Sequence, residues 1–164
     1  MRQKTFGIVV FLLLWLPQQA SALCTLVCSC TTSTTAVAFG VYNIHSPSAL
    51  DGVGNVRVTC GGVLGLLVPY DIALGKGMHS SNFSPRKMAS GSDQLNYDLY
   101  TSSARTTIWG DGTSGTQVVS GSVTIVLLGG TSSDHPVYGR IPSGQTSVPP
   151  GSYSDTVLVT VTYQ

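Results

Sequence analysis

The chain has 164 residues, a formal net charge of +1 and only 9% charged residues, whereas glycine alone contributes 19 residues. All seven acidic residues are aspartates, and the sequence has neither a basic patch for nucleic acid nor a charge run for a membrane surface. This composition excludes a nucleic-acid-binding protein and favours a single domain of short strands joined by tight turns.

The N-terminus has the three-part layout of a secretory signal peptide. Two positive charges within Met1–Lys4 precede an apolar run, Ile8–Leu16, and the small residues Ala20-Ser21-Ala22 follow. The apolar run is shorter than the roughly 20 residues of a membrane-spanning helix, so we expect no stable membrane span in the mature chain. We predict cleavage after Ala22, which divides the chain into a signal peptide, residues 1–22, and one exported domain, residues 23–164.

Four cysteines follow, and an even number in an exported protein predicts disulfide bonds. They are Cys24, Cys28, Cys30 and Cys60. Their spacing lacks the paired pattern of a zinc site, so we predict no metal and no cofactor. Four cysteines allow three pairings, and the residues alone leave the choice open. A lipid-modified Cys24 is the alternative that the sequence disfavours, because Leu23 stands where such a site needs a small residue.

Alternating or apolar runs between Gly, Ser and Pro predict strands along the rest of the chain. The predicted strands are residues 36–42, 55–60, 66–74, 95–100, 106–109, 122–128, 136–141 and 153–163. The last is the clearest, because Val157, Val159, Val161 and Tyr163 share one face, while threonines fill the other face except at Leu158. No helical stripe occurs outside the signal peptide, so the predicted fold class is all-β, a β-sandwich.

Several short motifs occur in a fixed order along the predicted domain. They are Cys30 followed by Phe39-Gly40-x-Tyr42, Val56-x-Val58-x-Cys60, Ile72-x-Leu74, Arg86-x-Met88, Leu95-Asn96-Tyr97-x-Leu99-Tyr100, Trp109-Gly110-Asp111-Gly112, Val137-Tyr138-Gly139-Arg140-Ile141-Pro142-x-Gly144-Gln145 and Gly151-x-Tyr153-x-Asp155-Thr156-Val157-x-Val159-Thr160-Val161-x-Tyr163. Together they cover roughly residues 30–163 and resemble the spore coat protein U family, which includes archaic chaperone–usher pilins. The resemblance implies an immunoglobulin-like sandwich and a Cys30–Cys60 disulfide. Cys24 and Cys28 would then pair with each other or with another chain.

The resemblance also implies a mechanism. A pilin sandwich lacks its last strand, and a strand from the next subunit, or from a periplasmic chaperone before assembly, completes it by donor-strand complementation. We expect the chain to end just after its clearest strand, so Val157, Val159, Val161 and Tyr163 are predicted to line the acceptor groove. The alternative is that they are ordinary core of a complete sandwich.

The implied partners are neighbouring pilus or coat subunits, a periplasmic chaperone and an outer-membrane usher. The implied location is the cell surface or an extracellular fibre, reached through the periplasm. One segment departs from the pilin pattern. Only Leu23–Ser29 precedes Cys30 in the predicted domain, and this piece is short for a donor strand and carries two further cysteines. The chain is therefore expected to accept a strand more readily than to donate one.

Catalytic interpretations have little support. Ser133-Asp134-His135 places triad residue types together in a predicted loop, but neighbours in one loop rarely face each other. The sequence has no Gly-x-Ser-x-Gly elbow and no glutamate for a pair of catalytic carboxylates. We therefore predict a structural protein and not an enzyme.

Conspicuous aromatic and charged residues suggest an alternative function, a surface adhesin or lectin-like module at a pilus tip. The aromatic residues Tyr97, Tyr100, Trp109 and Tyr138 would form its sugar-binding platform, although core packing is their other interpretation. Arg86 and Arg140 are predicted to form surface ion pairs with Asp98 or Asp155 at the ends of the sandwich.

Overall fold

The computed structural model describes residues 28–62, 65, 67–125 and 130–163, and within them every helix or strand element is a β-strand. The strands are β1 (Cys28–Thr35), β2 (Leu50–Gly62), β3 (Leu67–Leu74), β4 (Arg86–Ser90), β5 (Asp93–Tyr100), β6 (Val119–Thr124), β7 (Thr131–Ile141) and β8 (Val159–Tyr163). These residues contain no helix that is long and apolar enough to cross a membrane. The predicted signal peptide, its cleavage site at Ala22 and Cys24 lie outside the described residues.

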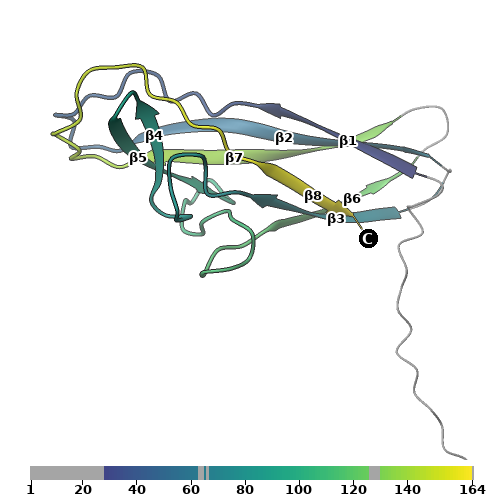
Figure 1. Ribbon diagram of the computed structural model, residues 1–164. Coiled ribbons are helices and arrows are strands. Elements are labelled where there is room, and N and C mark those ends of the chain that lie inside the picture. The colour runs from purple at the N-terminus through teal and green to yellow at the C-terminus, as the bar shows by residue number, and fades with distance from the viewer. Residues whose placement is uncertain (1–27, 63–64, 66, 126–129, 164) are drawn as a thin grey trace, which may run out of the picture.

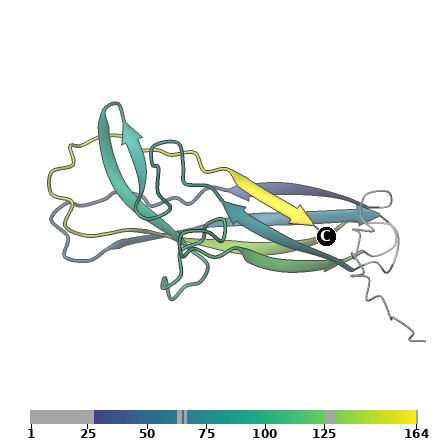
Figure 2. The same cartoon turned by 60° about the horizontal axis from the view of Figure 1, so that its bottom comes forward.

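The strands form two antiparallel sheets that pack as the layers of a sandwich (Figures 1 and 2). One sheet has the order β1-β2-β7-β5-β4, and the other has the order β6-β3-β8. The long pair β2 and β7 runs in continuous register from Leu50 opposite Ile141 to Cys60 opposite Thr131. The predicted all-β sandwich is confirmed.

The core lies between the sheets, where alternate residues of each strand point inward. On β2 these residues are Val56, Val58 and Cys60, and on β3 they are Tyr70, Ile72 and Leu74. Trp109 is fully buried in the same core and donates its indole N–H to the Ile72 carbonyl over 2.9 Å. Burial of each large apolar side chain stabilises the fold by about 1.5–3 kcal/mol relative to exposure.

Two predicted strands are wrong. Residues 36–42 form an extended segment outside both sheets, and residues 106–109 contribute only single-residue bridges at Ile108 and Trp109. The run 36–42 alternates like a strand because Val37 and Phe39 pack against the core, but this alternation reflects burial and not pairing. The left-handed conformation of Gly40, with φ of 76°, interrupts the run.

Other strand boundaries also differ from the prediction. The threonine- and serine-rich β1 was not predicted, because its polar sequence shows no apolar alternation. The short strand β4 was not predicted either, and its Arg86 is a buried residue instead of a surface one. The predicted strand over 153–163 shrinks to β8, because Ser154 pairs with Ala89 of β4 and lies beyond the edge of β3.

The two predicted arginine ion pairs are also wrong. Arg86 is fully buried, and its guanidinium donates to three backbone carbonyls, those of Gly75 (3.0 Å), Phe83 (3.1 Å) and Trp109 (2.6 Å). Arg140 forms a two-bond ion pair with Asp51, at 2.7 and 3.0 Å, across the β2–β7 pair. The sequence does not reveal either partner, because each depends on strands that meet only in the folded chain.

Candidate functional site

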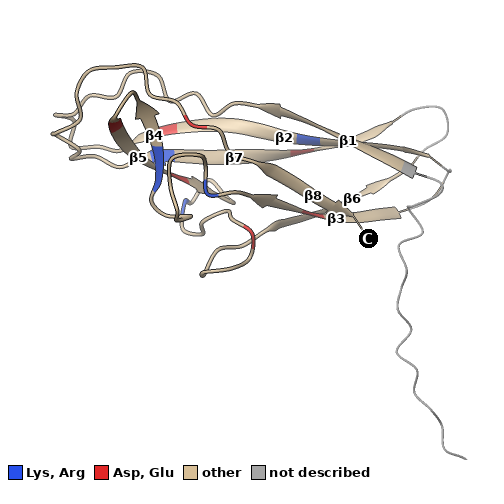
Figure 3. Cartoon of the chain, in the orientation of Figure 1, with Lys and Arg blue, Asp and Glu red and all other residues tan. Residues whose placement is uncertain are grey.

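One side of the sandwich is open. Among the described residues, strand β1 pairs only with β2, and strand β8 pairs only with β3, so each presents a backbone edge without a partner there. Residues of both strands line the same hollow, which places the two edges opposite each other. Neither strand carries a charged residue (Figure 3). We call this open side the seam.

A cleft of about 1180 Å³ opens along the seam. Its walls are residues 34–44, which continue from β1, and residues 148–157 with Val159, which lead into and enter β8. Its floor is the apolar core itself, formed by Leu74, Met88, Leu95, Tyr97, Leu99, Val137 and Ile141. The cleft is therefore a gap in the packing of the sandwich, with backbone on both sides and apolar side chains below.

The first wall rests on glycines. Val37 and Phe39 lie over inward-facing positions of β2 and β7 that carry no side chain. A Cβ at Gly54 would lie 2.6 Å from the Thr35 carbonyl oxygen, and a Cβ at Gly139 would lie 2.6 Å from the Phe39 ring. These glycines let residues 35–39 sink onto the inner face, where Phe39 meets Tyr97 edge-to-face at 6.1 Å.

The second wall is held by Asp155. Its carboxylate accepts hydrogen bonds from the Tyr97 hydroxyl (2.7 Å) and from the Met78 backbone N–H (2.9 Å). Burial, together with the hydrogen bond to Asp155, raises the pKa of Tyr97, so this hydroxyl stays a donor. Backbone bonds between Ser154 and Ala89, and from the Gly75 N–H to the Leu158 carbonyl, fix the same segment on its inner edge. Its outer edge faces the cleft.

The structure places the four predicted groove residues on one side of the last segment, but at different positions. Val157 and Val159 line the cleft and are half-buried. Val161 packs against the core farther along β8, and the Tyr163 side chain is 40% exposed. Sequence reasoning missed the opposite wall, residues 36–44, and the Val148–Gly151 segment, because neither is a strand.

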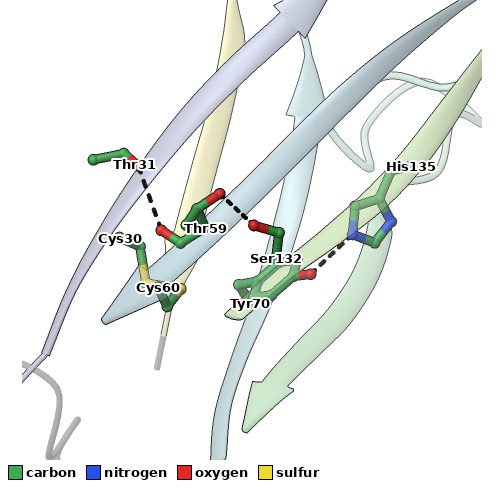
Figure 4. Close-up of a disulfide and its surroundings, with 7 residues drawn as sticks. All are labelled: Cys30, Thr31, Thr59, Cys60, Tyr70, Ser132 and His135. Carbon is green, nitrogen blue, oxygen red and sulfur yellow. Dashed lines mark hydrogen bonds between the residues drawn. A yellow bond between two sulfur atoms is a disulfide. The ribbon is translucent and has the colours of Figure 1, made fainter. Parts of the chain in front are cut away.

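A disulfide joins Cys30 to Cys60 at the opposite end of the seam (Figure 4). It ties the edge strand β1 to β2, and beside it the Thr31 hydroxyl of β1 donates to the Thr59 backbone carbonyl of β2 over 3.5 Å. Thr59 and Ser132 share a hydrogen bond of 2.8 Å beside it. The pairing that the family resemblance implies is thus present, while Cys24 and the side chain of Cys28 lie outside the described part of the chain.

The Ser133-Asp134-His135 sequence is not a catalytic site. It lies on strand β7, not in a loop, so successive side chains point to opposite faces. Asp134 points outward and binds Arg57 at 2.7 Å, which lowers its pKa to about 2. His135 points inward and bonds the Tyr70 hydroxyl at 2.9 Å. Within the described residues no group of three His, Cys, Asp or Glu side chains could hold a metal ion.

The four aromatic residues do not form the predicted sugar-binding platform. Trp109 and Tyr97 are buried in the core, and only Tyr100 and Tyr138 remain partly accessible. Tyr138 is covered on one side by the Arg105 guanidinium, 5.7 Å from its ring centre.

Comparisons with known proteins agree with one another. The family model described as "Spore Coat Protein U domain" matches residues 17–160. "Protein U" of Myxococcus xanthus is 36% identical over 138 residues, which cover 76% of this chain and 70% of that protein. A chain in a crystal structure of a CsuC–CsuE chaperone–tip adhesion subunit pre-assembly complex, from archaic chaperone–usher Csu pili of Acinetobacter baumannii, shares the fold, with a TM-score of 0.55 and 23% identity. The match covers 82% of this chain but only 39% of that one.

Proposed function

Because the chain belongs to the spore coat protein U domain family, we propose that it is an exported structural subunit of a surface fibre or coat, and not an enzyme. Its cleft receives a β-strand from a partner protein, which completes the sandwich. The proposed domain is residues 23–164, released from a signal peptide by cleavage after Ala22. The proposed location is the cell surface, reached through the periplasm.

The observation that carries this proposal is the apolar cleft along the seam, which reaches the unpaired edges of β1 and β8 at Thr34 and Val159 and continues between these strands. Exposed backbone N–H and C=O groups on a sheet edge favour pairing with another strand. An inserted strand would satisfy these groups and cover the exposed core, which is the general mechanism of β-augmentation. A strand of roughly ten residues, at about 3.3 Å per residue, would span each wall.

The structural relative suggests which partners to test. That structure is of a chaperone bound to a tip adhesion subunit before assembly. We propose that a periplasmic chaperone fills the cleft of this chain first, and that a neighbouring subunit replaces it at an outer-membrane usher. Val157 and Val159 would contact the inserted strand, while Val161 and Tyr163 would lie beside its end.

We propose that the chain accepts a strand and does not donate one. Cys28 and Ser29 belong to β1, and the Cys30–Cys60 disulfide holds that strand to β2. With cleavage after Ala22, only Leu23–Val27 would precede β1. This segment is about half as long as the walls of the cleft require.

Strand uptake is tested by measuring the thermal unfolding of the exported, oxidised chain with and without a peptide. The peptide has about twelve residues, with Leu, Ile and Val at alternate positions. We expect the unfolding midpoint to rise with peptide concentration, because a ligand that binds only the folded state stabilises it. Val159→Lys, in the cleft wall, should abolish the rise. Thr160→Lys, its exposed neighbour on the opposite face, should leave it intact. A midpoint that does not respond to any strand peptide or to a chaperone would contradict the proposal.

A further inference from the structure

The chemistry of the seam changes along its length, from the apolar cleft to the part of β1 near the disulfide. Cys30, Thr32 and Thr34 share one face of β1, and Cys30 reaches the core through its disulfide to the fully buried Cys60. Thr32 lies opposite Val58 and Thr34 opposite Val56, two residues of the buried core. Two threonines therefore occupy inward positions at which the neighbouring strand has valines.

These threonines line a second hollow that continues the cleft. It has a volume of about 620 Å³ and lies between Thr32 and Thr34 on one side and residues 75–78 and 156–159 on the other. Thr34, Val157 and Val159 line both spaces. A strand that fills the cleft and extends toward the disulfide would thus pass over Thr32 and Thr34.

Covering this part of the seam would bury the two hydroxyls. A buried hydroxyl without a hydrogen-bond partner is costly, whereas the same group facing a Ser or Thr side chain is satisfied. Thr59 and Ser132 form such a pair, at 2.8 Å, on the outer face of the same sheet. In the main cleft the requirement is the opposite, because its floor is apolar.

We infer that the strand recognised by this chain has two parts: large apolar side chains at alternate positions over the cleft, followed by hydroxyl-bearing side chains where it passes Thr32 and Thr34. This inference rests on the proposed strand uptake and names the chemistry of the partner strand. Thr32 and Thr34 are then the residues that select it. Because β1 and β8 run in opposite directions (Figure 1), the inserted strand is parallel to one wall and antiparallel to the other.

The test compares three fluorescent peptides of about twelve residues. One has apolar residues at all alternate positions, one has Ser at the two alternate positions nearest its N-terminus, and one has Ser at the two nearest its C-terminus. We expect one serine peptide to bind the oxidised full chain about tenfold more tightly than the apolar peptide, the effect of one additional satisfied hydrogen bond. The identity of the serine peptide that binds more tightly reports the direction in which the strand is inserted.

Thr32→Val/Thr34→Val is the decisive variant, because valine keeps the shape of threonine and removes the hydroxyl. It should remove the preference for serine and favour the apolar peptide. The matched control is Thr31→Val/Ser33→Ala, on the outer face of the same strand and outside both hollows, which should leave the preference unchanged. Equal binding of all three peptides to the unmodified chain, or a preference that survives in Thr32→Val/Thr34→Val, overturns this inference and leaves strand uptake standing. Binding of no peptide overturns both.

Discussion

Arg86 connects three segments that converge near the second wall of the cleft. Its guanidinium donates to the end of β3 at Gly75, to the following loop at Phe83 and to Trp109. Burial lowers its pKa, although Tyr97, Asp98 and Asp155 nearby oppose that effect. The side chain therefore serves as an internal set of donors for backbone carbonyls that would otherwise be buried without partners.

We predict that Arg86→Met lowers the free energy of unfolding by about 3 kcal/mol, because two buried carbonyls and one partly buried carbonyl lose their partner. Arg86→Lys should lose less unfolding free energy than Arg86→Met but should still be less stable than the unmodified chain. The lysine ammonium lacks the planar set of donors that reaches all three carbonyls. Arg140→Met, which removes an exposed ion pair, should cost at most about 1 kcal/mol. Urea unfolding measures all three, and equal losses for Arg86→Met and Arg140→Met would contradict the structural role.

His135 makes stability depend on pH. Burial lowers its pKa, and the neighbouring Asp134 only partly opposes this effect. The neutral imidazole that bonds Tyr70 is thus favoured in the folded state, while the unfolded chain takes up a proton near pH 6.5. The stabilisation is complete above about pH 6.5 and is lost as the pH falls toward the lower folded pKa.

We therefore predict that the free energy of unfolding declines as the pH falls below about 6.5, and that His135→Gln flattens this decline. His79→Gln, in an exposed loop, provides the control and should retain it. Denaturant unfolding at several pH values measures the slope. An identical slope in His135→Gln and the unmodified chain would show that another group is responsible.

At the scale of elements, the first wall of the cleft, which lies on glycines of β2 and β7, determines the width of the cleft. Residues 35–39 can approach β2 and β7 only where Gly52, Gly54 and Gly139 leave space. An alanine at these positions must push the wall outward or strain the sheet. Because Val37 and Phe39 pack against the core, either response also loosens core packing.

We predict that Gly54→Ala and Gly139→Ala each destabilise the chain by about 1–3 kcal/mol, the usual cost of overpacking, and weaken strand-peptide binding. Gly61→Ala is the matched control on the same strand as Gly54. A Cβ at Gly61 meets no atom within 4 Å, so this variant should be neutral or slightly stabilising. Unfolding and peptide titration together test the idea, and normal peptide affinity in Gly139→Ala would refute it.

Sequence reasoning located the elements whose alternation reflects a single buried face. Strands β2 and β5 and the valines of β8 follow from their own residues. The cleft does not follow, because it requires residues 36–44 to lie on glycines of two other strands. Nor does the burial of Arg86, whose three acceptors are spread over Gly75 to Trp109. Local pattern predicts which face is apolar, and only tertiary structure shows which apolar face remains uncovered.

At the scale of the molecule, the sandwich is open along the seam. The five-stranded sheet ends at β1 and the three-stranded sheet ends at β8, and no described strand bridges them there. The Cys30–Cys60 disulfide secures the strand that borders this opening. It thus holds in place an edge that has hydrogen-bond partners on only one side.

We predict that Cys30→Ala/Cys60→Ala lowers the free energy of unfolding by about 3–4 kcal/mol, because the bond closes a loop with a sequence separation of 30 residues in the unfolded chain. The same variant should bind strand peptides more weakly, since β1 is then free to leave β2 and carry one wall of the seam with it. Cys24→Ala/Cys28→Ala is the control, because a bridge between these close neighbours would close a much shorter loop. Urea unfolding and peptide titration of both double variants distinguish the outcomes. A larger loss in Cys24→Ala/Cys28→Ala would mean that the critical cross-link involves Cys24 or Cys28 and is not the Cys30–Cys60 bond.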